Sequence, residues 1–206
     1  MVNIGVLISG NGTNLQALID GIKERKIDGE IKLVISNKKD AYGLVRCRKE
    51  NIEALFIDPK DYDPISYNMR LVEEFRKRNV ELIVLAGFLR ILSKEFIKAY
   101  ENRIINIHPS LIPSFSGKGY YGERVHKAVL DYGVKYTGAT VHFVDEGADT
   151  GPIILQEAVP IDEKDTVDSL REKVLKVEHQ LLVKAVSLYC ENKLTVDGRK
   201  VIIDKE

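Results

Sequence analysis

Asn106 and His108 stand one residue apart in the segment IINIHPSLIPSF, which runs from Ile104 to Phe115. The apolar start of this segment predicts a strand, and alternation along an extended chain sends both polar side chains to the same side. An amide can donate to a developing oxyanion, and an imidazole can move protons near neutral pH. The pair therefore predicts one small volume suited to acid-base chemistry. The alternative is a strand end that runs into a proline-rich turn, with His108 bonded only to backbone.

A second polar cluster follows in the segment DEGADTGPII, where Asp145, Glu146 and Asp149 place three carboxylates within five residues. Carboxylate oxygens are typical ligands of calcium, but the spacing lacks the register of oxygens and the closing glutamate of an EF-hand. We expect no metal here. A solvated acidic turn is the structural alternative to a functional loop.

A glycine-bearing turn near the start of the chain is typical of a phosphate site. The turn comprises Gly12, Thr13 and Asn14, and it joins an apolar run to residues with helical spacing. Unpaired N–H groups at such a helix N-terminus attract phosphate. Leu15 replaces the third glycine of the dinucleotide fingerprint, so a mononucleotide-type site fits better than NAD. The turn can also serve as a tight connection only.

The elements that must position these residues follow a βαβα order. Continuous apolar runs predict buried parallel strands, namely Asn3–Ser9, Ile31–Ile35, Ala54–Ile57, Leu82–Ala86 and Ile104–Ile107. Later strands are expected at Thr137–Asp145 and Ile153–Ile161. The first of the later helices is expected at Ala41–Glu50, capped by Asp40, and the next should bury Ile65, Met69, Val72 and Phe75. Further helices are expected from Ser93 to Tyr100, at Glu123–Asp131, and over a long stretch after a cap at Asp165 or Thr166. The pattern predicts a single α/β domain with a mostly parallel, Rossmann-like open sheet flanked by helices.

The composition bounds the function further. The chain has 206 residues, 44% of them hydrophobic, with 31 basic and 31 acidic residues, which is typical of one soluble domain. The balanced charge gives no footprint for nucleic acid. The two cysteines lack zinc spacing, and we find no signal peptide and no apolar run long enough for a membrane span. We therefore expect a cytoplasmic protein with small-molecule partners, without nucleic acid or membrane, as a monomer or homodimer.

Three segments together resemble the phosphoribosylglycinamide formyltransferases, the folate-dependent family of purine synthesis. They are ISGNGTNL from Ile8, NIHPSLIPSF from Asn106 and GATVHFVDEGADTGPIILQ from Gly138. The resemblance includes LAGFLRIL from Leu85 and the helix around Glu178, and leaves only the last dozen or so residues uncovered. It implies one formyltransferase domain over residues 1–206. Residues 1–100 would bind the ribonucleotide phosphate, and residues 101–206 would hold the catalytic groups and the folate.

The resemblance implies formyl transfer from 10-formyltetrahydrofolate, a co-substrate, to the primary amine of glycinamide ribonucleotide. The amine would attack directly, because no activated Ser or Cys stands beside His108. Asn106 would orient the formyl group and stabilise its oxyanion, and His108 would donate and relay protons. Asp149 would hold His108 in its charged form, so we expect the pKa of His108 to lie above about 6.5.

The resemblance also implies the binding residues. Gly12, Thr13 and Asn14 would hold the phosphate, and Glu178 would meet the amino end of the ribonucleotide. The implied folate-binding set is Leu89, Arg90, Ile91, Leu92, Asn106, Asp145, Glu146, Gly147, Ala148 and Asp149. Where the family places lysine or another polar residue three before the glutamate, this chain has Leu175.

Several alternatives stay open at this point. Leu89 to Leu92 can be a core-packed strand exit, Glu178 and His179 can be a solvated pair, and His126 and His142 fit structural roles. A related formyl-transferring or formyl-hydrolysing enzyme would use a similar Asn, His and Asp set, and a non-catalytic nucleotide-binding module would need only the first strand, turn and helix. Residues Lys118 to Gly122 and the C-terminal tail carry no assigned role.

Overall fold

One sheet runs through the whole molecule in the computed structural model, which describes residues 1–204. In this part of the chain the strand order is β3-β2-β1-β4-β5-β6-β7-β9-β8. The first five strands in the chain pair in parallel, and they are β1 (Val2–Ile8), β2 (Gly29–Ser36), β3 (Ala54–Phe56), β4 (Leu82–Leu85) and β5 (Ile104–His108). The predicted mostly parallel α/β sheet is confirmed.

The direction of the sheet changes at β5. Strand β6 (Tyr136–Phe143) runs antiparallel to β5 and to β7 (Ile153–Pro160). A short hairpin of β8 (Leu194–Asp197) and β9 (Lys200–Ile203) extends the sheet beyond β7. The pairing of β5 with β6 sets Asn106 opposite His142 and His108 opposite Thr140. Because the pair is antiparallel, the end of β5 lies beside the first half of β6, and the loop after β6 folds back so that Asp149 reaches His108.

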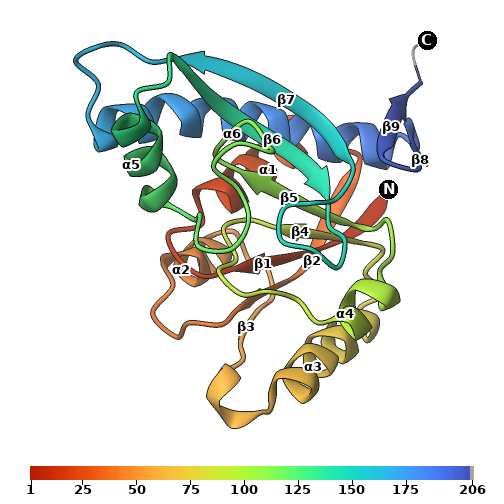
Figure 1. Ribbon diagram of the computed structural model, residues 1–206. Helices are drawn as coiled ribbons and strands as arrows, with labels where there is room; N and C mark the ends of the chain where they lie inside the picture. Colours follow the sequence, from red (N-terminus) through yellow and green to blue (C-terminus); the bar gives the residue numbers. More distant parts are fainter. Residues whose placement is uncertain (205–206) are drawn as a thin grey trace.

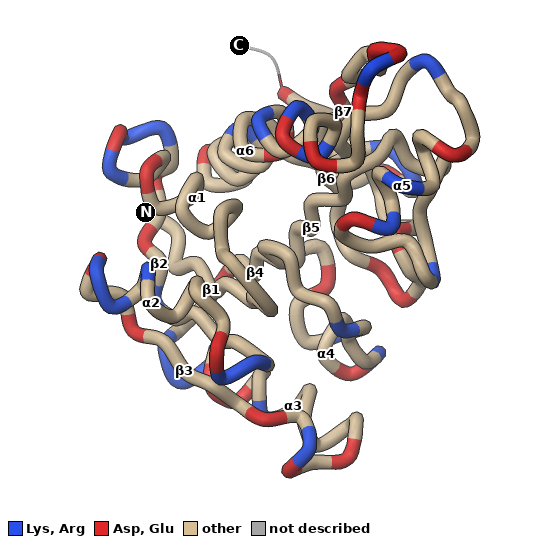
Figure 2. Tube along the Cα trace, turned by 90° about the vertical axis from the view of Figure 1, so that its left-hand side faces the viewer, with Lys and Arg blue, Asp and Glu red and all other residues tan. Residues whose placement is uncertain are grey.

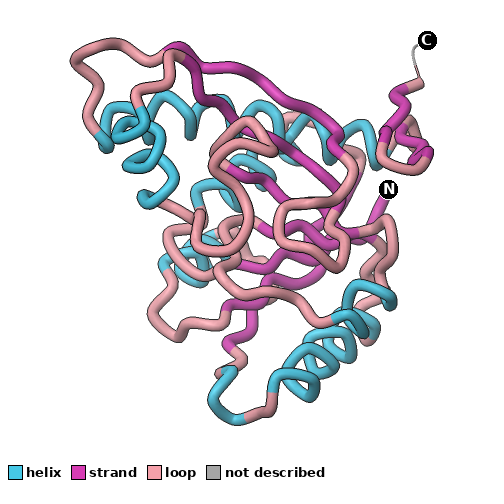
Figure 3. The backbone as a smooth tube through the Cα atoms, in the orientation of Figure 1, coloured by secondary structure: helices cyan, strands magenta, loops and turns pink. Residues whose placement is uncertain are grey.

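Helices cover both faces of the sheet (Figures 1 and 3). The apolar core on one side of the sheet joins Ile4, Val6 and Ile8 of β1 to residues of four helices, namely α1 (Thr13–Lys23), α2 (Tyr42–Lys49), α5 (Glu123–Tyr132) and α6 (Val167–Cys190). The core on the other side joins Leu7 to residues of two helices, namely α3 (Pro64–Arg76) and α4 (Lys94–Ala99). A 3₁₀ turn, Pro59–Asp61, precedes α3. Strand alternation explains why neighbours in β1 enter different cores.

The helix caps were predicted with mixed success. Ser93 accepts a hydrogen bond from the Phe96 N–H at the start of α4, and Thr166 forms a capping box with Ser169 at the start of α6, as expected. Asp40 was wrong as a cap, because α2 begins after Ala41 with no side-chain cap. In the first turn of α2, the Gly43 N–H instead donates to the Gly10 carbonyl.

The buried face of α3 also differs from the prediction. Ile65 and Met69 are 56% and 40% exposed, whereas Val72 and Phe75 are buried as expected. The buried stripe is completed by Tyr67 and Leu71. The helix therefore presents a different face to the core than predicted. Tyr67 and Leu71, each two residues after an expected position, make the apolar contacts in place of Ile65 and Met69.

The surface carries both signs of charge interspersed over the outer helices and loops (Figure 2). The ion pairs are mainly local, and Arg78 joins Glu74 and Glu53 beside α3 in one of the denser groups. In residues 1–204, no helix combines the length and the apolar character needed to cross a membrane.

Candidate active site

The polar residues of the site gather at the carboxyl ends of β4 and β5. Leu85 of β4 pairs in register with Asn106 of β5, so the chain leaving β4 lies beside the end of β5. In an open α/β sheet this edge is where ligand crevices form. Asn106 and His108 line the same cavity, which agrees with the predicted common side of the strand.

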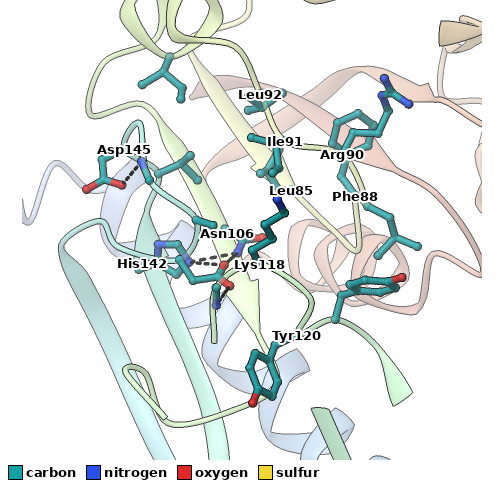
Figure 4. A pocket seen from close by; sticks show the side chains of 18 residues that line it. Leu85, Phe88, Arg90, Ile91, Leu92, Asn106, Lys118, Tyr120, His142 and Asp145 are labelled. Atoms are coloured by element: carbon teal, nitrogen blue, oxygen red, sulfur yellow. Dashed lines mark hydrogen bonds and ion pairs between the residues drawn. The ribbon is translucent and has the colours of Figure 1, made fainter. Parts of the chain in front are cut away.

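The amide of Asn106 is oriented by His142. The His142 Nδ1 lies 2.7 Å from the Phe143 carbonyl oxygen, so Nδ1 carries the proton and donates there. The lone pair on His142 Nε2 then accepts from the Asn106 Nδ2–H at 3.1 Å. The same Nδ2 lies 3.4 Å from Asp149 Oδ1 (Figure 4). This network fixes the orientation of the amide, with the NH₂ group toward His142 and Asp149. The hydrogen bond to Asp149 is long, so this N–H can donate to another acceptor instead.

The imidazole of His108 is held by a backbone carbonyl. Its Nε2 lies 2.9 Å from the Phe115 oxygen, a geometry in which Nε2–H donates. Its Nδ1 lies 3.5 Å from Asp149 Oδ2. Burial lowers the pKa of His108 below its usual value, although the Asp149 carboxylate and the Phe115 carbonyl favour the charged form. The expected raised pKa was therefore wrong, because the cost of desolvating the charged ring exceeds the attraction of Asp149.

Asp149 is placed by the loop that follows β6. Its backbone has φ of 56°, in the left-handed region, and its Oδ2 accepts the Gly117 N–H at 2.9 Å. Burial opposes its ionisation, yet His142, His108 and the Gly117 N–H together lower the pKa of this carboxyl below its usual value. Asp149 is thus a carboxylate that faces two imidazoles and an amide.

The proline-rich segment after β5 is tied to the antiparallel strands. Thr140 of β6 donates its hydroxyl to the Ser110 carbonyl at 2.6 Å and accepts the Ile112 N–H at 3.1 Å. Gln156 of β7 donates to the Ile112 carbonyl at 3.0 Å. Because this segment ends at Phe115, the bonds fix the carbonyl that orients His108.

Two adjoining cavities open at this edge. The first is the narrower and lies among the expected folate residues Leu89 to Leu92, together with Asp145, Gly147, Ala148 and His142 (Figure 4). The second runs from α1 to α6 past His108. They share six lining residues, which are Phe88, Leu89, Asn106, Tyr120, Tyr121 and Asp149. The two cavities therefore form one continuous cleft, with the amide and the carboxylate at their junction.

Glu146 behaves differently from the rest of its loop. It pairs with Lys94 of α4 at 2.9 Å and does not line the first cavity. Asp145 lines the cavity, while its Oδ1 accepts the Gly147 N–H at 3.0 Å and the Thr150 hydroxyl at 2.5 Å. The carboxylate of Asp145 therefore holds the turn, in which Gly147 and Ala148 also line the cavity.

The first turn of α1 faces the second cavity. Thr13 and Asn14 line it, and the helix begins at Gly12 without a side-chain cap, so N–H groups of the first turn are unpaired. Gly12 has φ of 71°, and a Cβ there would lie 2.8 Å from the Gly43 Cα. The glycine at position 12 is therefore required by the packing of α1 against α2. A larger residue would disturb the turn whether or not phosphate binds.

Glu178 closes the second cavity from α6. It is 8% exposed and accepts a hydrogen bond from Asn14 Nδ2 at 3.1 Å. Burial raises the pKa of this carboxyl to about 7, against the lowering effect of Asn14. The alternative of a solvated pair with His179 is wrong, because Glu178 is buried against the phosphate-type turn.

Two histidines have more to do with the site than sequence reasoning indicated. His142 joins Asn106 and Asp149, although a structural role was favoured for it. His126 is 2% exposed, lines the second cavity and has a buried Nδ1 without a partner. Burial lowers the pKa of His126 to about 4. In the sequence, only the alternation of β6 pointed to the position of His142. Its contact with Asn106 depends on the pairing of β6 with β5, which the sequence does not give.

No group of three or more His, Cys, Asp or Glu residues in positions 1–204 is arranged to hold a metal ion. Cys47 is buried and burial raises its pKa to about 11, so its thiol is unreactive. The chemistry available at the cleft is that of an amide, two imidazoles and a carboxylate.

Comparisons with known proteins agree with one another. The family model described as formyl transferase matches residues 2–186. The phosphoribosylglycinamide formyltransferase of Escherichia coli K12 is 39% identical over 204 residues, which are 98% of this chain and 94% of that protein. The chloroplastic phosphoribosylglycinamide formyltransferase of Vigna unguiculata is 38% identical over 98% of this chain, and the chain spans 66% of that protein's length.

Solved structures show the same fold. Glycinamide ribonucleotide transformylase 1 from Symbiobacterium toebii superposes with a TM-score of 0.94 at 46% identity, covering 98% of this chain and 94% of that one. A formyltetrahydrofolate deformylase from Pseudomonas syringae superposes with a TM-score of 0.89 at 26% identity, covering 99% of this chain and 66% of that one.

Proposed function

The chain belongs to the formyl transferase family, and we propose that it transfers the formyl group of 10-formyltetrahydrofolate to the primary amine of glycinamide ribonucleotide. The observation that supports this most directly is the junction of the two cavities. One cavity has an apolar wall for a pterin, and the other begins at a helix N-terminus suited to phosphate. Asn106 and Asp149 line both, and His108 stands beside them.

The proposed reaction needs no covalent enzyme intermediate. The amine nitrogen attacks the formyl carbon, and the carbonyl oxygen becomes an oxyanion that the Asn106 Nδ2–H stabilises in place of its long contact with Asp149. A proton leaves the amine for the lone pair of His108 Nδ1, which is free because Nε2–H donates to Phe115. The oxyanion then collapses to the carbonyl of the new formamide as the bond to the folate N10 breaks, and N10 receives the proton that His108 Nδ1 took from the amine. The neutral resting form of His108 suits it to accept the first proton.

The binding residues are proposed on the same basis. Thr13 and Asn14 supply unpaired N–H groups for the phosphate, with Gly12 shaping the turn. Glu178 meets the ribonucleotide from α6. The folate occupies the wall of Leu89, Arg90, Ile91 and Leu92 together with Asp145, Gly147, Ala148 and Asp149, whereas Glu146 lies outside it. Division of these tasks between residues 1–100 and 101–206, a cytoplasmic location, a monomeric or homodimeric state and the lack of a nucleic-acid partner stay predictions.

A second candidate is hydrolysis of the formyl group, because the deformylase of Pseudomonas syringae shares the fold. Water would then replace the amine as the nucleophile. The second cavity favours transfer, since a hydrolase has no use for a helix N-terminus and a buried Glu178 placed for a second substrate. A purely nucleotide-binding module would not need the cluster of Asn106, His108 and Asp149.

The deciding experiment mixes the protein with 10-formyltetrahydrofolate and follows tetrahydrofolate formation by absorbance. We expect product only when glycinamide ribonucleotide is present, with formylated ribonucleotide formed in equal amount. Product formation at the same rate without the amine would show a hydrolase. No product under either condition would refute both assignments.

We expect Glu178→Gln to raise the KM for the ribonucleotide about tenfold while making the protein more stable at pH 8. The pKa of this carboxyl is near 4.5 in the unfolded chain and about 7 in the folded protein. The folded state thus holds the proton more tightly, and stability is lost as the pH rises from about 4.5 to 7. Full ionisation at pH 8 costs up to about 3 kcal/mol, which the neutral amide avoids.

Urea unfolding at pH 5 and pH 8 measures this, with Glu172→Gln as the control because Glu172 is an exposed carboxylate two turns away on the same helix and cavity wall. The stability gained by Glu178→Gln should appear mainly at pH 8. A variant that is less stable than wild type at both pH values, or one with unchanged ribonucleotide KM, would contradict the assigned role.

A further inference from the structure

The second cavity poses an electrostatic problem for the proposed ribonucleotide. A phosphomonoester carries about −1.5 to −2 charges near neutral pH. The cavity wall already contains the carboxylates of Glu123, Asp149 and Glu172, together with Glu178, which burial leaves only partly ionised near pH 7. Position 175, which also faces the cavity, is a leucine and offers no polar contact. Unpaired N–H groups of α1 supply only part of a charge, so a full cation is needed to bind the dianion.

Arg171 is the one Lys or Arg that lines this cavity in the described part of the chain. It lies on α6 four residues before Leu175 and seven before Glu178, and these three positions share a helix face. Glu178 contacts Asn14 of the phosphate-type turn. Seven residues of helix rise about 10 Å, a distance that an arginine side chain and a bound phosphoryl group can bridge together.

The present partners of Arg171 hold it only weakly. Its Nη1 lies 2.8 Å from Glu123 Oε1, and its Nη2 lies 3.3 Å from Asp168 Oδ1. The side chains of Glu123 and Asp168 are 68% and 79% exposed, so water screens both pairs. A dianionic phosphate offers the planar guanidinium a stronger, bidentate contact. The ion pair with Glu123 can therefore be exchanged for the ligand.

Arg46 is the other guanidinium near the turn, but it is committed elsewhere. Its Nε donates to the Asn11 carbonyl at 2.9 Å, its Nη2 to Asn11 Oδ1 at 3.1 Å, and its Nη1 to Gln16 Oε1 at 3.2 Å. Arg46 does not line the cavity. It supports the turn from α2 through its bonds to Asn11.

We propose that Arg171 is the cation that binds the ribonucleotide phosphate, and that Glu123 holds this arginine until the phosphate binds and replaces it. The inference rests on the proposed function, because it assumes a phosphorylated substrate in the second cavity. It places specificity for phosphate on α6, one turn before the leucine that occupies position 175.

The first test compares Arg171→Gln with Lys176→Gln. Both variants remove one positive charge from α6, but Lys176 is exposed and does not line the cavity. We expect Arg171→Gln to raise the KM for glycinamide ribonucleotide about 10- to 100-fold with the folate KM unchanged, and Lys176→Gln to match wild type. Arg171→Lys should recover part of the loss, since it keeps the charge and loses the fork. Equal KM values in the two glutamine variants, or an equal rise in folate KM, would overturn the proposal.

The second test uses a substitution that should lower the ribonucleotide KM. In Glu123→Gln the carboxylate that competes with the phosphate for Arg171 is removed, so this KM should fall about two- to fivefold. Most of that gain should be lost when Arg171 is already glutamine, since only the direct repulsion between Glu123 and the phosphate is then removed. A rise in KM, or a gain that is equally large without Arg171, would show that the two residues do not compete.

Calorimetry with ribose 5-phosphate tests Arg171 without the formyl-transfer reaction, and ribose serves as the phosphate-free probe. Binding of ribose 5-phosphate that is kept in Lys176→Gln and lost in Arg171→Gln supports the proposal even if formyl transfer fails. Equal binding by all three proteins, or no preference of wild type for ribose 5-phosphate over ribose, overturns it while leaving an observed formyl transfer intact.

Discussion

Replacing Asp149 with Asn is expected to slow formyl transfer about a hundredfold to ten-thousandfold, the range typical of lost positioned proton transfer. The substitution keeps the shape of the side chain but removes the charge that faces His108 Nδ1 at 3.5 Å and Asn106 Nδ2 at 3.4 Å. His108→Ala should fall in the same range. Because the two side chains act on the same protons, the double variant should be little worse than the worse single variant.

The matched control is Glu146→Gln, which removes a carboxylate from the same loop. Glu146 pairs with Lys94 outside the first cavity, so its loss should leave the rate within about twofold of wild type. Fully additive losses in the double variant, or an equal loss in Glu146→Gln, would refute the pairing of Asp149 with His108.

The titration of His108 by NMR gives an independent test of the same pair. Burial already lowers the pKa of His108, and Asp149 opposes that effect. In Asp149→Asn the pKa should therefore fall further. For the wild type, kcat should fall only on the acid side of the ordinary histidine pKa, as the His108 base becomes protonated. An unchanged pKa in the variant would mean that Asp149 does not act on the imidazole.

The second large effect is expected for Asn106→Leu, which should lower kcat about a hundredfold to a thousandfold. Leucine has a similar shape but cannot donate to the oxyanion, and it leaves His142 Nε2 without its partner at 3.1 Å. The KM for the folate should change much less, because most of the first cavity is formed by other residues.

Binding of tetrahydrofolate, which lacks the formyl group, is the control for an intact cavity. Its affinity should be nearly unchanged in Asn106→Leu, since no oxyanion forms. A kcat within threefold of wild type, or a loss of tetrahydrofolate affinity that accounts for the whole rate loss, would show that Asn106 only shapes the cavity.

The strands and most helices could be predicted because their signals are local. Continuous apolar runs such as Leu82 to Leu85 identify buried parallel strands, and Ser93 and Thr166 cap helices through bonds to residues three positions later. Ile65 and Met69 were misplaced because the phase of α3 is set by contacts with the sheet and α4. Tyr67, Leu71 and Phe75 also have helical spacing, so the sequence allowed two apolar stripes and the tertiary contacts selected one of them.

The site could be predicted only where one strand carries it. Asn106 and His108 share a side because alternation is local, and a structural role was favoured for His142 because its place opposite Asn106 depends on which strand pairs with β5. The pKa of His108 was expected to rise because its carboxylate neighbour was considered and its burial was not. Depth in the protein follows from the packing of every surrounding element, so charge neighbours alone could not give the direction.

The reversal of the sheet at β5 has a consequence for how this site tolerates insertions and deletions. Asn106 faces His142 and His108 faces Thr140 across one antiparallel pair, whose register is regular, whereas the pairing of β6 with β7 shifts register between Val141 and His142. Adding or removing one residue in either strand would turn every later side chain to the opposite face. A library of single-residue insertions should therefore be depleted throughout β5 and β6, even at positions where many substitutions survive. It should be permissive in the connection between β7 and α6, where added length changes no alternation.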